Sequence, residues 1–446
     1  MNPTVQPSHV PPVRRTLACL TLLALAGCGG GADDPAANAA PQAEAGQRAQ
    51  VLAVRAPAVG TLSLASSNAA GKVRSGFLCE LSADGSMVAF GSDSTGLISG
   101  DTNSAADVFV KNLRTGAVVR VSTTSSGAQM HGAVCRAMTP DARFVLLSDG
   151  TALYVKNLAT QALTLVTPPP GVVANNQGFI GGAISDDGTK VAFITVPTQT
   201  YIGQYEYTNN VPARVMVRDL ASGTLTTLAT DDGVVAHGEV LSFELAISPD
   251  GKKVMFESSS AALVANDANG QADMFVRDLA TGSTSLVSSD SQGTPAAAVV
   301  CCFSSYYQPR FVSNTKVSFI QAQPSSLGDR GTLTKDLANG ATQLLLTSVE
   351  GDNVMLSADG SRLAFTRSYS GFDRRAYVRN VATGQEQVVS ATAAGVQSNG
   401  NVVSVLLSRD LSAVAFGSNA TNLLSPALAA PTPQVYVKTI AVASAP

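Results

Sequence analysis

Apolar and polar residues alternate in short runs along most of this chain, and turns rich in Gly, Asp and Ser separate the runs. A period of two predicts β-strands that turn one face toward a core. One unit recurs: Ser-x-Asp-Gly, a few variable residues, then an apolar run that ends in Phe. Clear copies are found at 82–90, 185–193, 248–256, 357–365 and 408–416, and altered copies at 139–147 and 311–319. Asp-Gly between two apolar runs predicts a hairpin, because Gly adopts a positive φ freely and Asp hydrogen-bonds the turn backbone.

A second unit follows each of these hairpins. It contains an aromatic or aliphatic residue, a β-branched residue, a basic residue, usually Asp or Asn, and an aliphatic residue. The copies occupy 109–113, 154–158, 216–220, 275–279, 333–337, 377–381 and 436–440. A Thr-Gly or Ser-Gly turn and another alternating strand follow in most copies. Each module therefore predicts four short strands in an antiparallel meander.

A single four-stranded meander cannot bury both of its faces, whereas modules packed around an axis can do so. The seventh module ends near residue 440 after its third strand, and residues 59–66 have the pattern of an unpaired fourth strand. We therefore predict an all-β fold over residues 56–440: a seven-bladed β-propeller of four-stranded antiparallel blades. In this prediction the N-terminal strand pairs into the last blade and closes the ring, and residues 441–446 form a short tail.

The repeat resembles the WD-repeat-like propeller repeat of TolB-like bacterial proteins. Ser-x-Asp-Gly followed by an apolar run ending in Phe carries the resemblance, although the chain contains no Trp and hence no Trp-Asp dipeptide. The resemblance implies a periplasmic or secreted propeller. It leaves function open, because such propellers serve as binding platforms, as accessory domains of enzymes and in some cases as enzymes.

The N-terminal segment has the features of an export signal. Arg14 and Arg15 precede an apolar stretch over 16–26, and Leu25-Ala26-Gly27-Cys28 follows. The stretch is short for a membrane span, and small residues precede the cysteine. The segment resembles a bacterial lipoprotein signal; a plain secretory signal is the alternative. The resemblance implies a signal peptide over 1–27, a lipidated Cys28, and a flexible tether over 28–55.

Composition and charge limit the classes of partner. The chain carries 29 basic and 32 acidic residues, and removal of the signal would take away Arg14 and Arg15 and no acid. A mature chain of this acidity is unlike a nucleic-acid-binding protein. Because Gly29 follows Cys28, the lipoprotein resemblance implies anchoring in the outer membrane, with the body facing either the periplasm or the cell surface.

Candidate ligand-binding residues gather at one predicted rim. Tyr201, Tyr205, Glu206 and Tyr207 lie in an insertion between two strands of the third module, and exposed tyrosines suit protein or sugar surfaces. His131 and His237 each precede a Gly at a junction between modules. In a propeller these positions share one face, so we predict a partner-binding rim; loops that pack on their own blades are the alternative.

Two related loops carry oxygen ligands at alternating positions. The first contains Asp101, Asn103 and Asp107, and the second contains Asp267, Asn269 and Asp273. Calcium binds such sets of oxygens, but both loops lack the terminal Glu of a calcium loop. Calcium binding and simple turn capping both remain open, and no other cofactor is expected.

Four cysteines follow Cys28, and export makes disulfides possible. Cys79 and Cys135 fall in the innermost strands of consecutive blades, one position out of register, so a bridge between the blades is one possibility. Cys301 and Cys302 could bridge each other or reach elsewhere. Burial of free thiols competes with both arrangements.

Together these features favour a monomeric, lipid-anchored propeller of the cell envelope that binds an envelope protein or a glycan without catalysis. The chain has no Gly-x-Ser-x-Gly, His-Glu-x-x-His or Gly-x-x-x-x-Gly-Lys motif. Two alternatives stay open. One is a lyase-type propeller enzyme acting on a saccharide or small molecule, which would need His, Arg and carboxylates clustered at the channel mouth. The other is a surface lipoprotein with a purely structural role.

Overall fold

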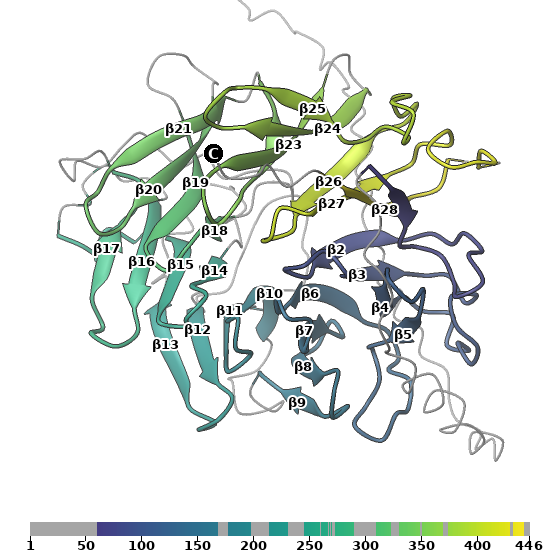
Figure 1. Ribbon diagram of the computed structural model, residues 1–446. Helices are drawn as coiled ribbons and strands as arrows, with labels where there is room; N and C mark the ends of the chain where they lie inside the picture. Colours follow the sequence, from purple (N-terminus) through teal and green to yellow (C-terminus); the bar gives the residue numbers. More distant parts are fainter. Residues whose placement is uncertain are drawn as a thin grey trace, which may run out of the picture. The chain divides into compact units, whose positions relative to one another are not determined.

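The strands form seven separate four-stranded antiparallel sheets, as the two repeated units predict (Figure 1). The computed structural model of the chain describes residues 60–167, 177–197, 214–230, 245–258, 260–265, 267, 269, 273–289, 309–322, 330–347, 350–368, 373–428 and 431–440. All of these fall within one unit, residues 41–446. The described residues contain no apolar helix of membrane-spanning length.

Blades 1 to 3 each take four consecutive strands. Blade 1 contains β2 (Phe77–Leu81), β3 (Met87–Ser92), β4 (Asp107–Asn112) and β5 (Val118–Arg120). Blade 2 contains β6 (Val134–Met138), β7 (Phe144–Ser148), β8 (Leu153–Asn157) and β9 (Leu163–Leu165). Blade 3 contains β10 (Gln177–Ile184), β11 (Lys190–Pro197), β12 (Arg214–Asp219) and β13 (Leu225–Thr230).

Blades 4 to 6 repeat this arrangement. Blade 4 contains β14 (Leu245–Ile247), β15 (Lys253–Ser258), β16 (Asp273–Asp278) and β17 (Thr284–Leu286). Blade 5 contains β18 (Arg310–Phe311), β19 (Lys316–Ala322), β20 (Arg330–Asp336) and β21 (Thr342–Thr347). Blade 6 contains β22 (Asp352–Leu356), β23 (Arg362–Ser368), β24 (Arg374–Asn380) and β25 (Glu386–Val388).

Blade 7 combines the two ends of the described chain. It contains β26 (Val402–Leu407), β27 (Ala413–Ser418) and β28 (Gln434–Thr439), and its outermost strand is β1 (Leu62–Leu64). Ser63 pairs with Val437 and Leu64 with Tyr436, so the N-terminal strand closes the ring (Figure 1). Hydrogen bonds from the Ala65 amide to the Val435 carbonyl (2.7 Å) and from Thr439 to Thr61 (3.0 Å) extend this ladder. The predicted closure and the count of seven blades are confirmed.

The hydrophobic core is divided among the junctions between blades. Seven buried clusters occur in the described residues, and each joins two neighbouring blades. The cluster between blades 7 and 1, for example, packs Val435 and Ala415 against Phe90 and Phe109. Such shared burial explains why one module is not sufficient for stability.

Aromatic side chains join the two halves of a module. The Phe that ends the first unit lies opposite the residue that begins the second, as Phe90 lies opposite Phe109. Their ring centroids are 5.9 Å apart, and the Phe416–Tyr436 rings of blade 7 are 5.4 Å apart. These separations fall in the favourable range for offset aromatic pairs.

The Ser-x-Asp-Gly turn is stabilised by its own side chains. Ser248 Oγ donates a hydrogen bond to Asp250 Oδ1 (2.7 Å) and accepts one from the Lys253 amide (2.9 Å). The same Ser or Thr to Asp bond occurs in the other copies except the fifth. Burial alone would raise the pKa of Asp250, but the hydrogen bonds of Ser248 and Lys252 lower it overall. In the seventh copy Leu411 occupies the Gly position with a φ of 61°.

The fifth copy differs because it lacks both Asp and Gly. The Val312 amide bonds the Lys316 carbonyl (2.8 Å), whereas in the first copy the Ser82 amide reaches the Met87 carbonyl (2.9 Å). The fifth turn is therefore one residue shorter.

The basic residue of the second unit joins neighbouring blades. Lys156 is completely buried, and its Nζ donates to the Thr123 carbonyl of blade 1 (3.0 Å). Lys335 Nζ bonds Ser289 of blade 4, and Lys438 Nζ bonds the Ala391 carbonyl of blade 6. Each ammonium thus satisfies carbonyl groups where the preceding blade ends.

A disulfide also connects two blades. Cys79 of β2 and Cys135 of β6 are bonded, with their Cα atoms 6.0 Å apart. Each cysteine lies at a register shift of its innermost strand. Cys301 and Cys302 lie outside the described residues.

Candidate ligand pocket in the central channel

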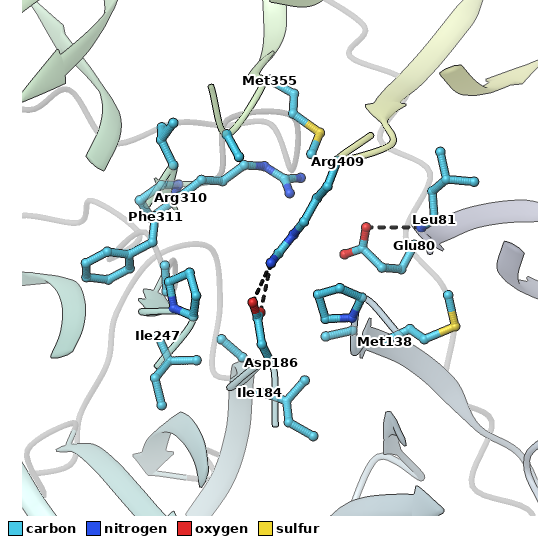
Figure 2. Close-up of a pocket in the computed structure, with 18 of the residues that line it drawn as sticks. Glu80, Leu81, Met138, Ile184, Asp186, Ile247, Arg310, Phe311, Met355 and Arg409 are labelled. Atoms are coloured by element: carbon cyan, nitrogen blue, oxygen red, sulfur yellow. Dashed lines mark hydrogen bonds and ion pairs between the residues drawn. The ribbon is translucent and has the colours of Figure 1, made fainter. Parts of the chain in front are cut away.

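The innermost strands surround a cavity of about 250 Å³. Its walls come from the carboxyl ends of these strands and from the Ser-x-Asp-Gly turns that follow them (Figure 2). The variable x residue of the repeat points to this cavity. The x residues that line it are Pro140, Asp186, Pro249, Ala358 and Arg409. The repeat therefore builds one mouth of the channel from one short turn per blade.

Backbone hydrogen bonds between turns hold this mouth together. The Ala83 amide bonds the Pro140 carbonyl (2.7 Å), and the Asp186 amide bonds the Pro249 carbonyl (3.1 Å). The Asp410 amide returns to the Ala83 carbonyl (3.0 Å), which links blade 7 to blade 1. Because these bonds join neighbouring blades, side chains at x positions are presented from a fixed frame.

Five charged residues line the cavity, and they come from five different blades. They are Glu80, Arg136, Asp186, Arg310 and Arg409. Three positive charges face two carboxylates. Apolar groups such as Phe311 and Met355 form the rest of the wall (Figure 2). A small cavity that combines apolar surface with a few charged groups is typical of a small-molecule site.

One ion pair crosses the channel. Arg409 of blade 7 makes a bidentate contact with Asp186 of blade 3, and its Nη2 lies 2.8 Å from Asp186 Oδ1. Figure 2 shows the Arg409 side chain extended across the channel toward Asp186. Both side chains keep contact with solvent, with side-chain exposures of 44% and 31%. A partly exposed pair of this kind contributes little stability, so a competing anion could displace it at small cost.

Glu80 lies beside the arginines in a low-dielectric setting. Burial by the channel walls raises the pKa of Glu80, while Arg310, the Leu81 amide and Arg409 partly oppose this shift. The Leu81 amide donates to Glu80 Oε1 at 3.1 Å. The Glu80 side chain keeps partial contact with the solvent of the channel. Its pKa is raised because the surrounding protein disfavours the charged form.

Arg136 and Arg310 have no close anionic partner. Neither guanidinium group makes a hydrogen bond or an ion pair within 4 Å with any residue in the described part of the chain. Burial lowers the pKa of Arg136, but a guanidinium stays protonated at physiological pH. Two guanidinium groups without a direct ion pair at the wall of a small cavity favour an anionic ligand, and a planar guanidinium suits a carboxylate.

His131, the one residue of the predicted rim that the structure describes, lies at the other end of its blade from the cavity. His131 is exposed and precedes β6, whereas the cavity is lined by the residues that end β6. Tyr201, Tyr205, Glu206, Tyr207 and His237 lie outside the described residues, as does Cys28. The rim stays a prediction, and the structure adds a separate pocket that the sequence analysis did not identify.

The first predicted calcium loop contains its own cation. Arg120 Nη1 lies 3.5 Å from Asp101 Oδ1 and 3.6 Å from Asp107 Oδ2, and all three side chains are buried. Gln129 also donates to Asp101 (3.0 Å), and Asn103 Nδ2 donates to the Met130 carbonyl (2.8 Å). Because Arg120 neutralises both acids within the fold, the structure favours the capping alternative over calcium binding for Asp101, Asn103 and Asp107.

The second loop retains the acids without that cation. Asp273 accepts hydrogen bonds from Ser288 Oγ and from Asn269 Nδ2 (2.7 Å). Asp267 is 7% exposed, and neither of its carboxylate oxygens has a hydrogen-bond partner. Among the described residues no three His, Cys, Asp or Glu side chains form a metal-binding group.

Comparison with known proteins supports the fold. No family model matches the sequence, and no curated protein matches it. Among solved structures, an oligogalacturonate lyase in complex with manganese is similar with a TM-score of 0.56 and 15% identity, over 86% of this chain and 91% of that one. An oligogalacturonate lyase from Vibrio parahaemolyticus gives 0.53 and 11%, over 86% and 92%. At these identities the likeness shows the propeller fold alone.

A TolB protein also appears among the similar structures. TolB from Acinetobacter baumannii is 15% identical over 83% of this chain and 81% of that chain, with a TM-score of 0.36. A score this low carries no argument about function. The class of protein established by the fold is a seven-bladed β-propeller of four-stranded antiparallel blades.

Proposed function

We propose that the central channel is a binding site for a carboxylate-bearing ligand, and that binding without turnover is the activity of the protein. The observation that carries this proposal is the pair Arg136 and Arg310, which line the cavity without a close anionic partner. Arg409 provides a third guanidinium once an incoming carboxylate replaces Asp186. A charge-assisted hydrogen bond to a carboxylate contributes about 1.5–3 kcal/mol, so two arginines supply about 3–6 kcal/mol, and contacts with the rest of the ligand add to this.

An acidic saccharide is the ligand class that this pocket suits best. The cavity of about 250 Å³ has room for one or two sugar units, and its walls combine apolar surface with charged groups. The similar lyases are named for oligogalacturonate, which is an acidic saccharide. Trigalacturonate, which can place one or two of its units in the cavity, is therefore a reasonable probe, with neutral maltotriose as its control.

Replacing Arg136 and Arg310 together by Gln is expected to weaken trigalacturonate binding at least 30-fold, because both guanidinium contacts are lost (about 2 kcal/mol or more). Asp186→Asn should instead tighten binding several-fold, because it releases Arg409. Affinity should also fall as pH rises through the raised pKa of Glu80, since ionised Glu80 repels the carboxylate. Calorimetry on the purified chain at several pH values measures all three effects.

Arg114→Gln is the matched control for this experiment. Arg114 pairs with Asp84 in an exposed position outside the cavity, so its loss removes the same charge without touching the site. Equal affinity of the wild type and the Arg136/Arg310 double variant would exclude the channel as the binding site. Binding to neither saccharide would favour the purely structural alternative.

A lyase is a second candidate, and Glu80 is the observation that favours it. A carboxyl group with a raised pKa beside arginines is a candidate for the proton transfer that uronate elimination requires. Such an elimination removes a proton from the carbon next to the carboxylate, and the leaving sugar oxygen takes up a proton. Formation of an unsaturated, ultraviolet-absorbing product that disappears in Glu80→Gln would establish this activity. Binding without any product supports the non-catalytic proposal.

We further propose that a lipid on Cys28 anchors this propeller in the outer membrane as a monomer. The motif at 25–28 supports the anchor, and the chain's own N-terminal strand completes the last blade, so closure of the ring needs no strand from a partner copy. In a bacterial host, the wild type should take up an alkyne-labelled fatty acid and fractionate with membranes. Cys28→Ser should lose the label and the membrane association. A labelled Cys28→Ser variant would contradict the assignment.

A further inference from the structure

Blades 1 and 4 contain equivalent acidic sites that differ in one neighbouring residue. Asp107 begins β4 opposite Ser92, and Asp273 begins β16 opposite Ser258. In both blades a serine hydroxyl donates to this Asp, from Ser122 and from Ser288. The same serines accept the amides of Val108 (3.1 Å) and Met274 (2.9 Å). The two sites are therefore equivalent in strand register and in local hydrogen bonding.

One residue distinguishes the two sites. The position opposite Phe109 is Arg120 in blade 1, and the position opposite Phe275 is Leu286 in blade 4. Arg120 neutralises Asp101 and Asp107 from within the fold. Leu286 cannot neutralise Asp267 and Asp273, and no described Lys or Arg pairs with either acid. In the sequence, Pro295 is the counterpart of Gln129 in the repeat, and proline has no side-chain donor.

The result is a buried, unpaired carboxylate. Asp267 is more than nine-tenths buried, both of its oxygens lack a hydrogen-bond partner, and Asp273 lies close enough to interact with it electrostatically. An isolated buried carboxylate is costly unless a cation or a proton accompanies it. Each acid at the blade 1 site meets this requirement through Arg120.

We propose that the blade 4 site binds one divalent cation, with calcium as the preferred ion, at the place that the Arg120 guanidinium takes in blade 1. The two oxygens of Asp267, the carboxylate of Asp273 and the side-chain oxygen of Asn269 are hard ligands of the kind that calcium prefers. Water completes the six to eight ligands that calcium takes. The cation crosslinks the loop before β16 to the strand itself, far from the channel pocket, so this site is independent of the proposed saccharide binding.

Titration of CaCl₂ into chelator-treated full-length chain tests the site. We expect one calcium per chain by calorimetry, and a rise in melting temperature of about 3 °C at a free calcium concentration 100 times the dissociation constant. Magnesium should bind more weakly, because it demands stricter geometry. Asp267→Asn should abolish both signals. If Asp267 instead retains a proton, calcium gives neither heat nor a shift, and the proposal is wrong.

Exchange of Arg120 and Leu286 between the two blades gives control variants that test the site without relying on Asp267→Asn alone. Leu286→Arg transplants the internal cation into blade 4, so this variant should stay folded and lose the calcium response. Arg120→Leu should create a second site, so two calcium ions should bind per chain and calcium should restore the melting temperature that the substitution lowers. A Leu286→Arg variant that still binds calcium with unchanged affinity would overturn the proposal.

Discussion

Replacement of Ser63 by proline is expected to lower the free energy of unfolding by about 3 kcal/mol, which is a large part of the stability of an ordinary domain. Ser63 lies opposite Val437, midway in the ladder that joins β1 to β28. Proline removes the amide donor at this position, and its ring disturbs the neighbouring pairs. Urea unfolding followed by circular dichroism measures the loss.

Ser63→Ala is the control for the closing strand. It keeps the backbone amide and removes only a half-buried hydroxyl, so its unfolding midpoint should lie close to that of the wild type. Limited proteolysis should cleave the proline variant near both chain ends before any other site. If the proline and alanine variants unfold at the same denaturant concentration, β1 does not close the ring.

Loss of the disulfide between blades 1 and 2 should also have a large effect. The bond joins residues separated by 56 positions, and a loop of this length predicts a stabilisation of about 4 kcal/mol from restriction of the unfolded chain. Engineered and natural cases more often give about 2–4 kcal/mol. The double variant Cys79→Ala/Cys135→Ala should therefore unfold at lower urea concentration than the oxidised wild type.

Reductant provides the independent check on this assignment. It should shift the wild type toward the double variant and leave the double variant unchanged, because its effect requires the bond. Peptide mapping without reduction should recover residues 79 and 135 in one crosslinked fragment. Identical unfolding of the oxidised wild type and the double variant would show that the bond does not contribute to stability.

The fold was predictable because its determinants are local and repeated. Ser248, Asp250 and Gly251 specify one hairpin within four positions, and the same pattern returns in other blades. The missing last strand could be assigned to residues 59–66 because an incomplete module at one end matched a surplus strand at the other. Where the pattern failed, as at Ser313, the turn itself changed length.

The channel pocket could not be predicted in the same way, because its charged residues come from five blades and are far apart in the sequence. Glu80 and Arg310 occupy the same register position of different innermost strands, opposite Ala89 and Ser318. A signal was nevertheless present. Asp186 and Arg409 are charged at the x position of Ser-x-Asp-Gly, where other copies have Ala or Pro. Variation at a fixed position of a repeat marks the place where the copies differ in function.

The contrast between the two acidic loops shows a second limit of local motifs. The two loops have the same spacing of acids and Asn, so the sequence pattern gives the same prediction for both: Asp101, Asn103 and Asp107, and Asp267, Asn269 and Asp273. The structure separates them through Arg120, which reaches the first loop from the neighbouring strand. Pairing across strands depends on register, and spacing within a loop does not report it.

A crystal structure of the chain with trigalacturonate tests the channel pocket most directly. We expect the ligand inside the channel, with a carboxylate within hydrogen-bond distance of Arg310 or Arg136, and with the contact between Arg409 and Asp186 broken. Ligand density at the opposite mouth beside His131, or an unchanged channel at a saturating ligand concentration, would contradict the assignment.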